Sequence, residues 1–540
     1  MSKNFLLLPV LILGYFLLLS FNLLGQPLYL DEGLYIFWAS LFSADSNLAY
    51  VSMQDGKTPL FIWIVGYLNT IFDNYLYTGR FVSVLSSTIT LICSMLLGWK
   101  IIGKKGAIWV FILFVVCPFN ILISRMAFVD SLMISFGTLS ITSLFFAREF
   151  GLRRNYFISG LLAVFSGIFL GLGFLTKSTI RVYLVAEIFI IGTWIFAEIK
   201  SLMVNPKRGF LQILKSHHFK RLVFLMFAAT IITAIYFEIL GYLRFGAQRF
   251  WGMLSIKESD LTFSLREILM NITGQGAAHI YFENLPLFGE YFLVYFGTLL
   301  VFFLVGIYQI LKRRLNLWLL ILVFIFSTAV FLSAKIIASR YITIVIPFVL
   351  IISAVGVNKI WESNFKFKRL LSISLFILPA VFSGLLILSP LKAVYSSDDR
   401  SYFLESDLNL PEIEWISKYF SLKPEAVVGV EASWGVAEGL VTALNEQGVK
   451  TIILNRVIRK EPTEELTCKQ GFIDDNKQCW KIDMGGLKDH FDKEIYLYMT
   501  VTEDRTRILN STADIELIRE FKRTGGGPSS YLYKFKGYRN

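Results

Sequence analysis

The sequence predicts an α-helical polytopic membrane protein with about 11–13 transmembrane helices and a C-terminal α/β domain outside the cytoplasm. Of its 540 residues, 55% are hydrophobic and only 17% are charged, whereas soluble chains average about 25% charged residues. Apolar runs of membrane length recur as far as residue 389. From residue 391 to 540 charged residues become frequent and no such run remains. We therefore expect a membrane domain over residues 1–390 and a separate domain over 391–540.

The predicted spans are apolar runs that approach the length of about 20 residues needed to cross a bilayer. They lie near residues 5–24, 79–99, 107–123, 130–147, 157–175, 179–197, 221–243, 291–311, 316–334, 340–357 and 370–389. The first run lacks a clear small-residue cleavage site, so we expect a retained helix rather than a signal peptide. The shorter run 59–72 is expected as a half-helix that lies in the interface or dips into the membrane.

The charges of the short loops predict the orientation. With a cytoplasmic N-terminus, the inside loops are 100–106, 148–155, 198–221, 312–314 and 359–369, and each is basic. The positive-inside rule therefore supports this assignment, and an odd number of spans places residues 391–540 outside. Two long outside loops follow, at about 26–78 and about 244–290. Basic loops that face anionic lipid account for the net charge of +12 without nucleic-acid binding.

The C-terminal domain is predicted to alternate strands and helices. Residues 424–432, 450–458, 494–501 and 529–537 have strand patterns, and residues 434–448 and 513–523 have helical patterns. The domain contains no phosphate-binding loop and no nucleophile constellation, which favours an accessory or acceptor-recognition role. Cys468 and Cys479 could form a disulfide outside the cytosol, whereas Cys93 and Cys117 fall in apolar helices and are expected to be inert core thiols.

Charged side chains gather on the outside, close to the membrane boundary. They are Asp31, Glu32, Asp55, Lys57, Arg125, Asp130, Lys177, Arg181, Lys335 and Arg340. Acids in such places are costly to desolvate, and cations outside run against the positive-inside rule, so a bound anion is their simplest explanation. The cations could hold a lipid-linked phosphate, and a carboxylate could remove a proton from an attacking hydroxyl or amine. Solvated loop acids, snorkelling cations and helix-capping acids are the structural alternatives.

Five motifs then follow one another in a specific order: LYLDEGLYIFWA, GKTPLFIWIVG, SRMAFVDSLMISF, GLGFLTKSTI and SRYITIVIPFVLIISA. In this order the chain resembles the polytopic glycosyltransferases of the C fold class (GT-C). Within that class it resembles the superfamily of protein O-mannosyltransferases and lipid A aminoarabinose transferases. The resemblance covers about residues 28–354 with gaps. It implies transfer of a sugar from a polyprenyl-phosphate donor.

The resemblance also implies roles for individual residues. Asp31 matches the family's first-loop acid, the expected base or acceptor-orienting group, with Glu32 beside it, and Asp130 matches a second acid for acceptor or metal. The donor phosphate would be bound by residues that match family positions or lie beside them: Lys57, Lys177, Arg340, Arg125 and Lys335. Asp55, Tyr341, His279 and Glu283 are further candidates. Gly56 stands where the family often has Glu, which puts the substrate in doubt more than the reaction class.

The sequence therefore predicts an inverting membrane glycosyltransferase that acts on the outer face of the cytoplasmic membrane. Its partners would be a polyprenyl-phosphate sugar, an extracytoplasmic acceptor (a protein, a lipid A-like glycolipid or a cell-envelope glycan) and the bilayer. No cofactor is required, although a divalent metal between Asp31 and Asp130 stays open. A transporter or flippase of lipid-linked sugars is the alternative, and it predicts inverted repeats and polar residues near the bilayer midplane. A receptor or scaffold would explain the C-terminal domain but not the charges of the first loop.

Overall fold

The computed structural model describes residues 7–26, 28, 30–52, 57–153, 155–204, 223–233, 278–312, 321, 324–325, 327–328, 332, 339–363, 366–388, 410–431, 436–453, 458–460, 471–473, 479–482, 485–500, 513–521 and 530–538. The chain divides into two compact units. The first comprises residues 1–21, 47–64 and 80–388, and the second comprises residues 22–46, 65–79 and 389–540. The second unit thus combines the C-terminal residues with two segments of the predicted first outside loop.

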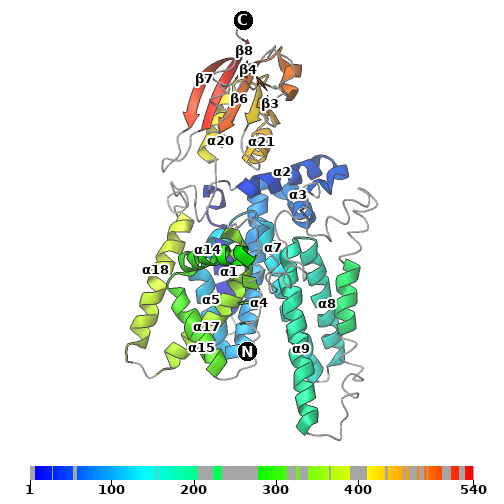
Figure 1. The fold of residues 1–540 in the computed structure, drawn as a ribbon, viewed down its shortest axis with the longest axis vertical. Coiled ribbons are helices and arrows are strands. Elements are labelled where there is room, and N and C mark those ends of the chain that lie inside the picture. The colour runs from blue at the N-terminus through cyan, green and yellow to red at the C-terminus, as the bar shows by residue number, and fades with distance from the viewer. Residues whose placement is uncertain are drawn as a thin grey trace. The chain divides into compact units, whose positions relative to one another are not determined.

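The first unit is built from helices (Figure 1). They are α1 (Leu7–Ser20), α4 (Tyr75–Ile102), α5 (Lys104–Val116), α6 (Pro118–Ser124), α7 (Val129–Leu152), α8 (Tyr156–Phe174), α9 (Arg181–Val204), α14 (Ala278–Phe296), α15 (Leu299–Lys312), α17 (Ile346–Glu362) and α18 (Lys368–Leu388), with the 3₁₀ helices η5 (Ser178–Ile180) and η6 (Ser339–Val345). The first five residues of α4 belong to the second unit. The predicted half-helix is α3 (Leu60–Phe72), whose later residues also belong to the second unit.

Among the described residues, five helices are long and apolar enough to cross a membrane, or up to seven spans if two bent pairs are each counted as one. The pair α5 and α6 bends by 72°, and the pair α14 and α15 bends by 107°. The first break precedes Pro118, which cannot donate the helical hydrogen bond, and the second contains Gly297 with φ of +48°. The predicted spans 221–243 and 316–334 lie mostly outside the described residues.

The end of the predicted second outside loop is helical instead. Residues 278–290 form the first part of α14, and the rest of that loop lies outside the described residues. The segment is apolar apart from a few polar side chains, and it continues directly into the predicted span at 291. The helix therefore begins before the predicted span, with Pro286 inside it, whereas its membrane-length apolar part begins at Phe288.

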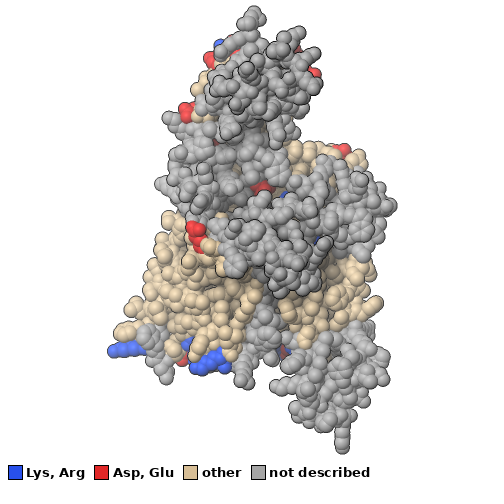
Figure 2. Space-filling model, in the orientation of Figure 1, with Lys and Arg blue, Asp and Glu red and all other residues tan. Residues whose placement is uncertain are grey.

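Three of the predicted inside loops meet at one end of the first unit. Lys100 forms an ion pair with Glu149 at 2.8 Å, which joins the first two inside loops. Lys105 and Glu362 approach within 3.6 Å, so the loop at 359–369 lies there too. Figure 2 shows Lys and Arg side chains gathered below a band of uncharged surface at this end. The grouping of these basic loops agrees with the predicted topology.

The second unit contains α2 (Leu30–Ala44), α20 (Leu410–Ser421), α21 (Val436–Glu446) and a five-stranded sheet. The sheet has the order β2 (Lys450–Ile453), β1 (Val427–Glu431), β6 (Ile495–Thr500), β8 (Ser530–Tyr538) and β7 (Ala513–Phe521). Strand β1 is parallel to β2 and β6, whereas β8 is antiparallel to β6 and β7. A second sheet has the order β3 (Ile458–Lys460), β5 (Cys479–Ile482), β4 (Gly471–Ile473). The predicted α/β character is confirmed.

One element of this domain was predicted wrongly. Residues 513–523 were expected as a helix, but residues 513–521 form strand β7. The register of β7 against β8 shifts between Leu517 and Arg519, which leaves Ile518 as an extra residue. A bulge of this kind interrupts the alternation of a strand. Ile515 and Ile518 are three positions apart in the sequence, a spacing that also occurs on one face of a helix.

Helices α2 and α21 pack closely at a glycine. A Cβ atom at Gly439 would lie 2.5 Å from Leu28 Cδ2 and 2.8 Å from the backbone Cα of Gly33. Only a residue without a side chain permits this approach. The contact holds α2, whose first turn contains Asp31 and Glu32, against the C-terminal residues, so both acids belong to the second unit.

Candidate active site

Three of the predicted site residues meet in the first unit. Asp130 is the second residue of α7, Lys177 lies in the turn between α8 and η5, and Tyr341 lies in η6. Lys177 Nζ donates to Asp130 Oδ1 at 2.7 Å and lies 5.3 Å from the centre of the Tyr341 ring. The structure thus brings together three motifs that are up to 211 positions apart in the chain.

The ion pair is shielded from solvent. The side chain of Asp130 is 4% exposed and that of Lys177 is 19% exposed. Asp130 Oδ2 is buried and has no hydrogen-bond partner among the described residues. Asp130 lies in the first turn of α7, at the positive end of the helix dipole. The cluster therefore contains a fixed ammonium group and a buried oxygen that can accept a further hydrogen bond.

The motif around Lys57 is tethered to the same turn. The backbone N–H of Leu60 donates to the carbonyl of Leu175 at 3.1 Å, two residues before Lys177. On the other side of Lys57, its backbone N–H donates to the Ser52 carbonyl at 3.1 Å, and the Ser52 hydroxyl donates back to the Lys57 carbonyl at 3.1 Å. Residues 57–60 are thus held in place at both ends, beside the turn that positions Lys177.

Two arginines of the first unit are fully buried. Arg125 follows α6 and Arg80 lies near the start of α4, and both are 0% exposed. Burial, followed by the charge of Arg80, lowers the pKa of Arg125 to about 10. The side chain therefore remains a cation at neutral pH, and the two guanidinium groups are close enough to influence each other. Arginine forks suit phosphate because they can bind it through two parallel hydrogen bonds.

Arg80 was missed by the sequence analysis. Its signal was a single cation at the outer end of an apolar run, which also marks an ordinary helix boundary. Only the fold brings it close to Arg125.

The remaining candidates are placed in part. Asp31 and Glu32 lie in the first turn of α2 and are buried, at 7% and 0% exposure. The backbone of Arg340 lies in η6, and the backbones of His279 and Glu283 lie in α14. Asp55, Lys335 and Cys468 lie outside the described residues, so the disulfide with Cys479 stays a prediction. Over the described part of the chain, no group of three or more His, Cys, Asp or Glu residues could hold a metal.

Comparison with known proteins supports the predicted class. A model of the family described as dolichyl-phosphate-mannose-protein mannosyltransferase matches residues 56–236. The fold is similar to the crystal structure of ArnT from Cupriavidus metallidurans bound to undecaprenyl phosphate, with 14% sequence identity, a TM-score of 0.57 and 98% of each chain covered. The apo state of ArnT from the same organism gives 13% identity, a TM-score of 0.55 and the same coverage. An oligosaccharyltransferase from Archaeoglobus fulgidus, in complex with Zn and sulfate, gives 14% identity and a TM-score of 0.44 over 82% of this chain and 62% of that chain.

No curated protein sequence matches the chain. The family match includes the motifs of Lys57, Asp130 and Lys177, and the likeness of fold to ArnT extends through the C-terminal domain. Together the findings confirm the predicted fold class: the chain has the fold of ArnT, a protein of the C fold class, and residues 56–236 match the mannosyltransferase family model.

Proposed function

We propose that the chain transfers a sugar from a polyprenyl-phosphate donor to an acceptor on the outer face of the cytoplasmic membrane. The observation that carries this proposal is the convergence of the Lys57, Asp130, Lys177 and Tyr341 motifs in one unit. The buried Arg80 and Arg125 add two cations to the same unit. ArnT, whose fold is similar, has been crystallised with undecaprenyl phosphate bound, which supports a lipid phosphate as the donor here.

In the proposed reaction, the bond between the anomeric carbon and the phosphate oxygen breaks. A bond forms between that carbon and a hydroxyl or amine of the acceptor, with inversion of configuration. Asp31 takes the proton of the attacking group. The polyprenyl phosphate leaves with the bonding electrons, and Lys57 and Arg340, with the arginines of the first unit, stabilise the charge that develops on its oxygen.

The Lys177 ammonium group has a defined part in this scheme. Lysine carries three N–H donors and needs one for Asp130, so the others can reach a phosphate oxygen. Asp130 holds the side chain in one position, which lowers the entropy lost when the donor binds. Asp130 then positions Lys177, a role that differs from the predicted second catalytic acid.

The proposal is tested with the purified chain in liposomes and a radiolabelled polyprenyl-phosphate sugar. Asp31→Asn should abolish transfer of the label while donor binding persists, since the substitution removes the base and keeps the size of the side chain. Asp45→Asn, a change of the same kind at an exposed position beyond the end of α2, is the matched control and should keep full activity. Undiminished turnover by Asp31→Asn would refute the role of Asp31.

The same assay separates the transporter alternative. A flippase would move the labelled lipid across the bilayer without releasing polyprenyl phosphate. Release of the lipid phosphate that depends on an acceptor supports transfer, and movement without release would overturn the proposal.

A further inference from the structure

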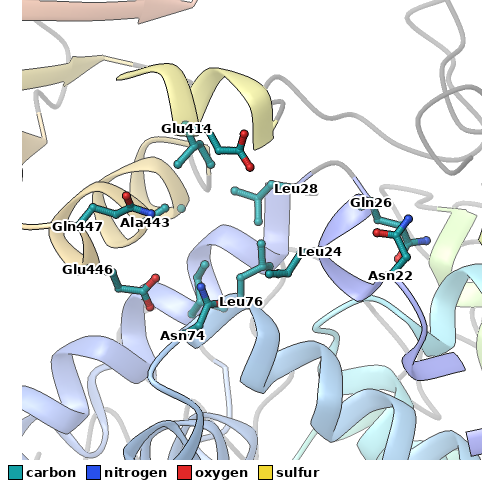
Figure 3. Close-up of a pocket in the computed structure, with 14 residues that line it drawn as sticks. Asn22, Leu24, Gln26, Leu28, Asn74, Leu76, Glu414, Ala443, Glu446 and Gln447 are labelled. Atoms are coloured by element: carbon teal, nitrogen blue, oxygen red, sulfur yellow. The ribbon is translucent and has the colours of Figure 1, made fainter. Parts of the chain in front are cut away.

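The second unit contains a pocket that the proposed reaction does not use. Its volume is about 400 Å³, and it lies between the residues before α2, the start of α4 and the helices α20 and α21. Figure 3 shows Glu414 and Glu446 on its wall, with both carboxylates directed toward the interior and Leu28 facing the space between the two helices. All of its lining residues belong to the same compact unit.

The charge of the pocket has one sign. The described lining contains the carboxyl groups of Glu414 and Glu446 and several side-chain amides, and it contains no Lys, Arg or His. Burial raises the pKa of Glu446 to about 7, and a cation bound beside this carboxyl favours its charged form. Neither Glu414 nor Glu446 forms an ion pair with a described residue. Such a wall repels phosphates, so this pocket cannot serve the donor headgroup, and it attracts cations.

The side chain of Glu446 lines the pocket and is held by a hydrogen bond from the backbone. Its Oε1 accepts a hydrogen bond of 2.7 Å from the backbone N–H of Tyr75, the first residue of α4. This contact occupies one oxygen of the carboxylate, and the second oxygen can accept from a ligand. Because a glutamine can provide the same acceptor for Tyr75, the charge of this position can be removed without removing the contact.

The rest of the lining is aliphatic. Leu28, Ile413 and four other aliphatic or alanine side chains line the pocket, and no aromatic side chain does so among the described residues. Sugars commonly use aromatic rings as stacking partners, so a bare glycan is a poor match. A methylene stem that ends in a cation is a good one, since the stem can lie on the aliphatic wall and the charge can reach the carboxylates.

We propose that this pocket binds a basic side chain, of lysine or arginine type, carried by a polypeptide segment. The segment would place its alkyl stem against Leu28 and Ile413 and its cation between Glu414 and Glu446. The further claim that this polypeptide is the acceptor of the sugar rests on the proposed function. The claim that the pocket binds a basic side chain does not.

The test is fluorescence polarisation with the full chain in detergent and a fluorescein-labelled pentapeptide, Gly-Ser-Lys-Ser-Gly. A second peptide replaces lysine with norleucine, which keeps the stem and removes the cation. The lysine peptide should bind about 5- to 30-fold more tightly, as expected for two ion pairs that are open to solvent. The preference should weaken in about 0.5 M salt, because salt screens charges that solvent can reach.

Variants of the two acids decide the location. Glu414→Gln should lose part of the preference for lysine, and Glu414→Gln with Glu446→Gln should lose it all. Asp489 is an exposed acid of the same unit, in the 3₁₀ helix η7 (Gly485–His490), and does not line the pocket. Asp489→Asn should therefore keep the preference for lysine. Equal affinity for the two peptides, or a preference that survives in both glutamine variants, would overturn the proposal. Glu414→Gln alone suffices if the double variant does not fold, because Glu414 is exposed.

Sugar transfer is measured on the same preparations. A chain that transfers sugar from the lipid donor but does not prefer the lysine peptide refutes only the pocket. A chain that prefers the lysine peptide but has no turnover with any acceptor refutes only the proposed function.

Discussion

The ion pair between Asp130 and Lys177 offers the sharpest test of how the site is held together. We expect Asp130→Asn and Lys177→Gln each to destabilise the chain, and the two together to destabilise it by less than the sum. In Asp130→Asn, the ammonium group loses its carboxylate but keeps 19% of its side-chain surface in solvent. In Lys177→Gln, a carboxylate that is only 4% exposed loses its partner. Lys177→Gln should therefore be the more damaging change.

The magnitude follows from burial. Removing one member of a fully buried ion pair costs about 3–5 kcal/mol. Partial exposure of Lys177 reduces this cost, so we expect about 1–2 kcal/mol for Asp130→Asn and about 2–4 kcal/mol for Lys177→Gln. The double variant should then lose about 1–3 kcal/mol less stability than the sum of the two single variants. This difference is the coupling energy of the pair, and its size is usual for residues in contact.

The assay is thermal unfolding of the four chains in one detergent at one scan rate. The ion pair of Lys105 and Glu362 is the matched control, because its atoms are 3.6 Å apart and its side chains are 65% and 48% exposed. Exposed pairs contribute about 0–1 kcal/mol, so the variants Lys105→Gln and Glu362→Gln should be nearly additive. Additive shifts at Asp130 and Lys177 as well would show that the pair does not hold the site, and the positioning role would fail.

Three further outcomes are expected. Gly439→Ala should destabilise the second unit by about 1–3 kcal/mol, because the new methyl group meets Leu28 and the α2 backbone; unchanged thermal unfolding would contradict the close packing. Hydrogen bonds from Lys534, Lys423 and Tyr496 lower the pKa of Glu494 to about 2, from its usual value of 4.5. The charged carboxylate therefore contributes its full stabilisation above about pH 4.5, and this contribution disappears as the pH falls toward 2. The melting temperature of Glu494→Gln should equal that of wild type at about pH 2 and lie below it at about pH 6. Arg80→Met should weaken donor binding about tenfold or more, as expected for a lost charged hydrogen bond; equal affinity in a polyprenyl-phosphate binding assay would exclude Arg80 from the phosphate site.

The sequence predicted where the charged motifs meet better than it predicted what each residue does there. Motif order and loop charge were enough to place Lys57, Asp130, Lys177 and Tyr341 in one candidate site, since each motif lies at one end of a predicted span or half-helix on the predicted outer side of the membrane. The pairing of Lys177 with Asp130 could not be predicted, because it depends on side-chain geometry between helices that are far apart in sequence. Arg80 was missed for the same reason: one cation beside an apolar run has no distinctive spacing.

Errors in the secondary structure have local causes. Strand β7 was taken for a helix because one extra residue, Ile518, changes the spacing of its apolar side chains. The run 107–123 was expected as one span, and the structure still permits one span there, but with a bend of 72° before Pro118 that the prediction did not include. In both places a single residue changed the path of the backbone, by a bulge or by a bend. The overall hydrophobicity of the segment, on which the prediction was based, stayed the same.

The contact between Lys177 and Asp130 changes the interpretation of the site. A lysine side chain at a phosphate site is normally flexible, and ordering it costs up to about 2 kcal/mol of rotamer entropy. Here the carboxylate of Asp130 fixes Nζ before any donor arrives, and the Tyr341 ring covers it from another side. Loss of Asp130 should therefore raise the donor concentration needed for half-maximal rate and leave the pH dependence unchanged. A second catalytic acid would instead change the pH profile, so the same Asp130→Asn chain distinguishes a positioning role from proton transfer.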